Sequence, residues 1–324
     1  MAEKSTKIMV VGTGAVGSIY AWRLAKTAHV TTVCRSNYEI VKNTGLEIDS
    51  KKFGKEIFKP DNVVRTVAEG VTSEPFDYIV VTLKALPEVY NVAEIIAPAI
   101  TKGKTTVVLI QNGLGVEEPI TQAFPENPIV SIVAYIGTSQ ISPGQILMVG
   151  DESLIVGDYK NAPVDSTAQR EKFAGILEKG GVTVQKVDDV ERVRWQKLFW
   201  NASFSPVCAV THMTTSDVLR NKEAMKSVKN LMSEVIQAAN AMGYDFNEKE
   251  QMATMIERTE ATALNYKPSM QLDLERGQPM EVEVILGTPL RRAISKGLNV
   301  PHLEMMHDLC SAINSHTMHE KAQL

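Results

Sequence analysis

The distribution of apolar residues divides the chain into two halves of different character. Up to about residue 188, short runs rich in valine and isoleucine alternate with segments of helical periodicity. Runs of this kind are typical of parallel strands covered by helices on both faces. We therefore predict an α/β domain with a doubly wound parallel sheet. Its expected strands are IMVV (8–11), VTTVC (30–34), DYIVVTL (77–83), TTVVLI (105–110) and PIVSIVAYIG (128–137).

Two further segments, ILMVG (146–150) and SLIVGD (153–158), predict a hairpin at the sheet edge, near the turn-like SPGQ. From about residue 189 the pattern becomes helical, with few strand-like runs. We predict an all-helical domain from there to the C-terminus. Its expected helices cover residues 190–209, 221–242, 247–264 and 279–296.

Composition limits the classes of function. The 324 residues suffice for two ordinary domains, and 44% hydrophobic with 22% charged residues is typical of a globular protein. The net charge of -4, without a basic cluster, argues against nucleic acid as a partner. No apolar stretch approaches the roughly 18 residues of a membrane span. The first seven residues lack a following apolar region, so we expect no secretory leader.

The cysteines and histidines show no spacing typical of metal ligands, so we expect no metal site. The cysteines are also far apart in the sequence, which favours a reducing compartment, and we expect a cytoplasmic protein. Oligomeric state is not determined by the sequence, and a homodimer is one arrangement that it leaves open. The three cysteines are Cys34, Cys208 and Cys310.

The segment GTGAVG follows the first expected strand and opens a helix. Gly12 permits a tight turn, Gly14 lets backbone approach a pyrophosphate, and Gly17 lets helix and strand pack closely. The N-terminus of the helix presents free N–H groups to the anion. The alternative is a purely structural glycine turn. We predict a nucleotide-binding loop that also includes Thr13, Ala15 and Val16.

The end of the second strand discriminates between cofactors. NAD sites usually have an acid about 20 residues after the glycines, which binds the ribose 2′-hydroxyl. Here VCRSN places Arg35 and Ser36 at that position. A guanidinium suits a 2′-phosphate, so NADP(H) is favoured. The alternative is a surface arginine.

Polar residues also follow the third and fourth strands. Lys84 comes after one, and Gln111, Asn112 and Gly113 come after the other. Ligands of open parallel sheets bind outside the carboxyl ends of the strands, so these residues should face the cofactor. Ordinary turn chemistry explains Asn-Gly equally well.

In the second half, RWQKLFWNAS places Lys197 and Asn201 one helical turn apart, among apolar residues. An ammonium group is costly to bury there, which suggests a proton donor. The alternative is a surface lysine whose methylenes cover aromatic rings. Further on, Ser269 and Glu281 are candidates, although an acid near a helix start is also favoured by the helix dipole alone.

The ordered set of motifs resembles the ketopantoate reductase family (2-dehydropantoate 2-reductase). The set is GTGAVG, a basic residue after the second strand, TLKA, QNG, K-L-x-x-N, P-S-M and E-V-E-x-x-x-G, between about residues 7 and 304. The resemblance implies an NADP-binding Rossmann-type domain (1–188) and a helical substrate and catalytic domain (189–324). It also implies NADPH-dependent reduction of the 2-keto group of ketopantoate to pantoate, a step toward pantothenate and coenzyme A.

The resemblance assigns roles to single residues. Lys197 takes the position of the family's catalytic lysine, and Asn201 that of a substrate-binding asparagine. Glu281 matches an acid near cofactor and substrate, able to steady Lys197. The remaining matches are a lysine on the cofactor side, an asparagine near nicotinamide and substrate, and a serine that holds the substrate, which are Lys84, Asn112 and Ser269.

The chain departs from the family pattern on the substrate side. Ser205 stands where the family often has a second asparagine, and a further asparagine is missing around Thr214 and Thr215. A different small 2-keto acid or another carbonyl compound is therefore an alternative substrate. A catalytically silent NADP-binding sensor is a third hypothesis, but it leaves Lys197, Ser269 and Glu281 unexplained.

Replacing Arg35 with Ala should raise the KM for NADPH and raise that for NADH much less, because only NADPH carries the 2′-phosphate. Steady-state kinetics with each cofactor measures the difference. Equal effects on the two cofactors would remove Arg35 from phosphate recognition.

Overall fold

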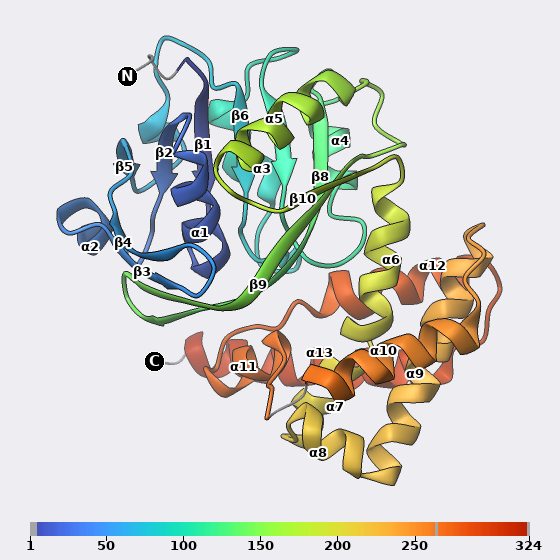
Figure 1. Cartoon of the computed structure of the whole chain (residues 1–324). Coiled ribbons are helices and arrows are strands. Elements are labelled where there is room, and N and C mark those ends of the chain that lie inside the picture. Colours follow the sequence, from blue (N-terminus) through green and yellow to red (C-terminus); the bar gives the residue numbers. More distant parts are fainter. Residues whose placement is uncertain (1–4, 263–264, 323–324) are drawn as a thin grey trace. The chain divides into compact units, whose positions relative to one another are not determined.

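The computed structural model describes residues 5–262 and 265–322 and divides into two compact units (Figure 1). The α/β unit contains residues up to 84, 91–111 and 116–190. The helical unit contains residues 85–90 and 112–115, together with the chain from 191 onward. Two short segments of the first half, each following a sheet strand in sequence, therefore belong to the helical unit.

The described part of the α/β unit is built on one ten-stranded sheet. The strand order is β4-β3-β9-β8-β7-β6-β1-β2-β5, with β10 paired to β9. Pairing is parallel from β8 through β7, β6, β1 and β2 to β5. The strands are β1 (Lys7–Val11), β2 (His29–Val33), β3 (Leu46–Ser50), β4 (Gly54–Phe58), β5 (Asn62–Val64), β6 (Tyr78–Val81), β7 (Thr106–Leu109), β8 (Ile129–Ser142), β9 (Gln145–Asp158) and β10 (Val184–Val187).

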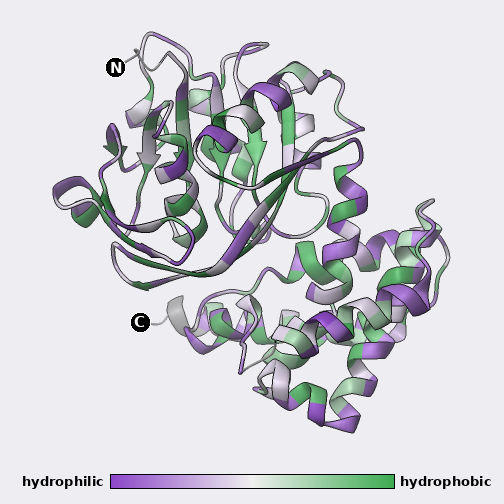
Figure 2. Cartoon of the chain, viewed as in Figure 1, coloured by the Kyte–Doolittle hydropathy of each residue, from purple (hydrophilic) through white to green (hydrophobic). Residues whose placement is uncertain are grey.

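The predicted fold class is confirmed. The five predicted strands correspond to β1, β2, β6, β7 and β8. Most residues of the first four strands are buried, as are the first five residues of β8, and these strands are largely hydrophobic (Figure 2). Helices α1 (Ala15–Leu24) and α5 (Thr167–Lys179) pack on the sheet, where Tyr20, Trp22 and Phe173 join its core. Shorter helices in this unit are α2 (Tyr38–Asn43), α3 (Val92–Ile96) and α4 (Glu118–Ala123), with 3-10 turns η1 (Ala68–Gly70) and η2 (Ala97–Ala99).

Two details of the predicted sheet are wrong. Strands β3, β4, β5 and β10 were not predicted, because each is short and has only two hydrophobic residues. The hairpin is formed by the long strands β8 and β9, and both predicted segments lie within β9. It is not at the edge, because β9 pairs with β3, β8 and β10.

The helical unit surrounds a core of aromatic side chains. Trp195, Phe199 and Phe204 are fully buried, and Phe199 packs edge-on against Phe246 at 4.9 Å. No described helix is long and apolar enough to cross a membrane. The elements are α6 (Val190–Asn201), α7 (Phe204–Thr211), α8 (Thr215–Arg220), α9 (Lys222–Ala241), α10 (Glu248–Thr262), α11 (Ser269–Glu275), the π-helical turn η3 (Glu283–Gly287), α12 (Thr288–Ser295) and α13 (Pro301–Ala322).

The predicted helices of this half are interrupted more often than expected. The segment 190–209 divides into α6 and α7, and 279–296 contains the π turn before α12. The predicted helix 247–264 corresponds to α10, and its last two positions lie outside the described residues. Helix α13 starts against buried Glu234, whose carboxylate accepts hydrogen bonds from the backbone N–H groups of His302 and Leu303.

Candidate active site

The glycine loop has the close approaches that its sequence predicts. Gly12 has a φ of +103°, which favours glycine, and Thr82 Oγ1 donates to its carbonyl at 2.6 Å. A Cβ on Gly17 would lie 2.2 Å from the Gly12 oxygen, so helix α1 can approach the loop only with glycine there. A Cβ on Gly14 would meet no atom within 4 Å. The loop therefore leaves open space at its second glycine.

The loop is also fixed to the end of β2. Thr13 Oγ1 donates to the Val33 carbonyl at 2.9 Å, and buried Asn37 donates to the Thr13 carbonyl at 2.9 Å. Arg35 and Ser36 are exposed between these contacts. Asn37 was not predicted; the only sequence signal for it is a turn-forming residue just after a strand.

These features fit a phosphorylated dinucleotide. The first turn of α1 has no side-chain cap, so its N–H groups remain available to an anion. The loop follows β1, which lies between β2 and β6 in the sheet. Strand order changes direction at β1, and sheets of this kind bind ligands beside such a strand. Exposed Arg35 supplies a cation near the loop, and exposed Lys84 follows β6 on the same edge of the sheet.

Three of the predicted site residues form one hydrogen-bonded chain within the helical unit. Lys197 Nζ donates to Asn112 Oδ1 at 2.9 Å, and Asn112 Nδ2 donates to Glu281 Oε2 at 3.1 Å. The other carboxylate oxygen, Oε1, accepts from the backbone N–H of Ala85 at 2.9 Å. An amine, an amide and a carboxylate are thus held in a fixed order.

The backbone next to Asn112 is also fixed by close contacts. Gly113 has a φ of +89°, and a Cβ there would lie 2.4 Å from Val284. Its carbonyl accepts from the buried Arg194 guanidinium at 3.0 Å, and the Leu114 N–H donates to the Val284 carbonyl at 2.8 Å. The sequence QNG is therefore more than a turn here, because its glycine lets segment 112–115 pack against the π turn.

The surroundings of Lys197 change its acidity. The pKa of its ammonium group is lowered from 10.5 to about 8, mainly by burial and in addition by the nearby charge of Arg194. The Glu281 carboxylate opposes both effects by favouring the charged amine. Arg194 was not predicted as a site residue; its spacing of one turn before Lys197 on α6 is the signal that points to it.

The remaining predicted residues are not joined to this chain by hydrogen bonds among the described residues. Asn201 is the half-buried last residue of α6, and Ser269 is the exposed first residue of α11. Tyr266, shortly before Ser269, packs near Trp200, with ring centroids 6.2 Å apart. Trp200 in turn precedes Asn201 directly.

The positions that depart from the family pattern have structural contacts. Thr214 caps α8 by accepting from the Asp217 N–H, and Thr215 donates twice to the Tyr266 carbonyl, at 3.0 and 3.2 Å. Ser205 is buried in α7. Of these residues, Thr215 contacts the segment that leads to Ser269.

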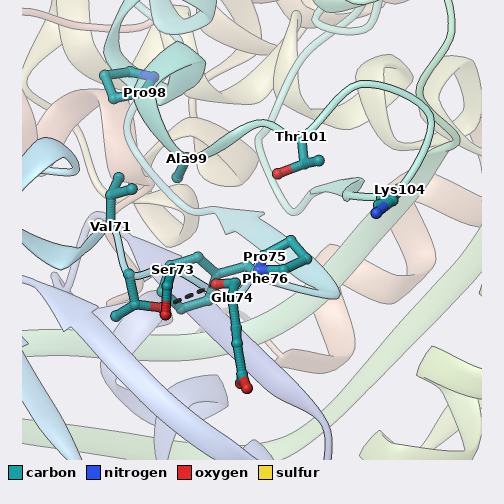
Figure 3. A pocket seen from close by; sticks show the side chains of 10 residues that line it. Val71, Ser73, Glu74, Pro75, Phe76, Pro98, Ala99, Thr101 and Lys104 are labelled. Atoms are coloured by element: carbon teal, nitrogen blue, oxygen red, sulfur yellow. Dashed lines mark hydrogen bonds between the residues drawn. The ribbon is translucent and has the colours of Figure 1, made fainter.

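A separate hollow of about 230 Å³ lies in the α/β unit (Figure 3). It is lined by residues 71–76 and by four residues between 98 and 104, which precede β6 and β7. The glycine loop follows the carboxyl end of the parallel strand β1. The hollow therefore lies at the opposite end of the sheet, and it contains none of the predicted site residues.

Comparison with known proteins shows which family the chain resembles. Residues 8–161 match the family described as "Ketopantoate reductase PanE/ApbA", and residues 189–314 match its C-terminal counterpart. The chain is 28% identical to a 2-dehydropantoate 2-reductase of Nostoc, over 93% of each chain. It is 32% identical over 99% of its length to the meiotically up-regulated gene 72 protein of Schizosaccharomyces pombe, and spans 59% of that protein.

A solved structure gives the same result. The crystal structure of 2-dehydropantoate 2-reductase from Methylococcus capsulatus is 33% identical, with a TM-score of 0.84, over 96% of this chain and 97% of the other. The two proteins are therefore similar in both sequence and fold along nearly the whole length of this chain. The chain belongs to the ketopantoate reductase family, whose members are NADP-dependent oxidoreductases.

Proposed function

We propose that this protein reduces the 2-keto group of ketopantoate to pantoate with NADPH, in pantothenate and coenzyme A biosynthesis. The observation that carries the proposal is the chain Lys197–Asn112–Glu281, in which a desolvated amine is held by an amide and steadied by a carboxylate. The relatives named 2-dehydropantoate 2-reductase support the choice of substrate.

The α/β unit is assigned to the cofactor. Backbone of the loop Gly12–Gly17, including Thr13, Ala15 and Val16, binds the pyrophosphate, and Arg35 binds the 2′-phosphate. Lys84 adds positive charge on the same sheet edge. When bound, NADPH supplies the hydride; Asn112 and Glu281 are proposed to contact its nicotinamide end.

The helical unit is assigned to the substrate and its proton. A ketone that accepts a hydride becomes an alkoxide, which needs a proton and nearby positive charge. Lys197 supplies both, and its lowered pKa makes it a better donor than an ordinary lysine. Glu281 keeps the amine protonated, and Asn112 orients it. Asn201 and Ser269 are proposed to hold the substrate.

A second candidate substrate is another small 2-keto acid or carbonyl compound. The observation that favours it is the structural use of both threonines, because Thr214 caps α8 and Thr215 holds the Tyr266 carbonyl before Ser269. Threonine hydroxyls used in this way do not replace the amides of the family pattern. The chemistry at Lys197 is the same for both substrates.

Replacing Lys197 with Ala should lower kcat by on the order of 10²-fold or more, as expected for loss of a general acid.

In the wild type, the rate of ketone reduction should be constant at low pH and fall as the pH rises through about 8, because the amine then loses its proton. A kcat–pH profile measures both. Replacing the exposed Lys226 with Ala serves as the control, and an unchanged profile in Lys197→Ala would contradict the assignment.

Initial rates of NADPH oxidation with ketopantoate should exceed those with unbranched 2-keto acids. The assay compares ketopantoate with a panel of close analogues. Equal or faster turnover of an unbranched acid would favour the second candidate. Binding of NADPH without oxidation by any carbonyl compound would contradict both candidates and favour an NADP-binding sensor.

A further inference from the structure

The residue before Glu281 is held by the C-terminal helix α13. Buried Asn314 accepts from the Met280 N–H through Oδ1 at 2.9 Å, and donates to the Met280 carbonyl through Nδ2 at 2.9 Å. Met280 is itself fully buried. One side-chain amide thus satisfies both backbone groups of a single buried residue, which fixes the position and orientation of that residue.

Helix α13 holds the residue two positions after Glu281 as well. His307 Nε2 lies 2.9 Å from Glu283 Oε1, and Arg291 donates to Glu283 Oε2 at 2.6 Å. The Glu283 contacts are at its side chain, whereas Asn314 binds the backbone directly before Glu281. The Asn314 contact therefore controls most directly where the Glu281 carboxylate lies.

The carboxylate has little freedom of its own to compensate. Its two oxygens accept from Ala85 N–H and from Asn112, and each bond requires a particular position of the Glu281 backbone. A shift of about 1 Å is enough to weaken such bonds and to slow a reaction strongly. Loss of the Asn314 amide would also leave the buried Met280 N–H unpaired and leave the Met280 carbonyl with one donor instead of two, which favours such a shift.

We propose that Asn314 is a positioning residue that acts through Glu281 to hold Lys197 in its reactive state. The proposal rests on the role proposed above for Lys197. Asn314 itself does not contact substrate or cofactor in this account. Its effect is transmitted along the hydrogen-bonded chain from Met280 and Glu281 to Asn112 and Lys197.

The charges around these groups give the expected direction of the effect. Lys197 faces Arg194 from its own helix, which lowers its pKa, and Glu281 from the segment before η3, which raises it. Glu88, in segment 85–90, lies near Glu281 and Glu283, and burial together with their charges raises its pKa. Displacement of Glu281 therefore removes the charge that favours the Lys197 ammonium, and the pKa of Lys197 falls.

The test uses the full chain with Asn314→Leu, which keeps the branched side-chain shape without its polar atoms, and Asn314→Ala. Thr317→Val is the matched control, because Thr317 is also buried on α13 and its hydroxyl donates to the Ile313 carbonyl of its own helix. We expect kcat to fall about tenfold or more in the Asn314 variants, with little change in the KM for substrate. The alkaline fall of the kcat–pH profile should move to lower pH, and Thr317→Val should leave both unchanged.

A second readout does not depend on turnover. The Lys197 amine is titrated by NMR in protein with ¹³C-labelled lysine, and its signal is assigned by its loss in Lys197→Met. In Asn314→Leu its pKa should fall by about one unit, as expected for loss of a nearby opposite charge. This measurement remains informative if no keto acid is reduced, so failure of the proposed function and failure of this inference are distinguishable.

The final experiment combines Asn314→Leu with Glu281→Gln. If Asn314 acts through Glu281, the effect of Asn314→Leu on the Lys197 pKa and on kcat should largely disappear in the Glu281→Gln background. Additive effects would overturn the proposal, as would an unchanged Lys197 pKa in Asn314→Leu. Failure of both Asn314 variants to fold would also overturn it, because the role would then be structural.

Discussion

A buried ammonium group is unfavourable unless polar partners surround it, and Lys197 has such partners. Its amine donates to Asn112, which donates to Glu281, which accepts from a backbone N–H. Removing the amine from water favours its neutral form, whereas the Glu281 charge favours its protonated form. The balance leaves a pKa near neutrality, which suits a group that must hold a proton and then release it.

The features nearby are those needed to maintain this chain. Gly113 lets segment 112–115 lie against Val284, Arg194 holds the Gly113 carbonyl, and a π-helical turn follows Glu281. Such turns occur often at functional sites, because they change the direction of side chains within a helix. Segments distant in sequence are thereby fixed at one place in the helical unit.

The two units use different kinds of chemistry. The glycine loop of the α/β unit offers backbone N–H groups and open space, and its side chains mainly fix the loop to β2. The helical unit instead offers side chains with matched charge and acidity. Backbone N–H groups suit the diphosphate, which many unrelated proteins bind in this way. Side chains suit a proton transfer and the recognition of a particular keto acid.

Some of this arrangement is determined by local sequence. Runs of valine and isoleucine identify the central strands, and the spacing of Gly12, Gly14 and Gly17 identifies the loop. The spacing of Lys197 and Asn201 places both on one side of α6. These features are readable because strand and helix geometry depend on residues close in the chain. Strands β3 and β4 were missed because each has only two hydrophobic residues among five.

Tertiary structure alone decided which of the candidates meet. Asn112 lies 85 residues from Lys197 and 169 from Glu281, and Asn314 lies 34 residues from Met280. No local periodicity encodes such pairs, because they depend on how whole elements pack. Motif spacing therefore identified the candidate residues, whereas the buried contacts that set the Lys197 pKa, and the support from α13, follow only from the fold.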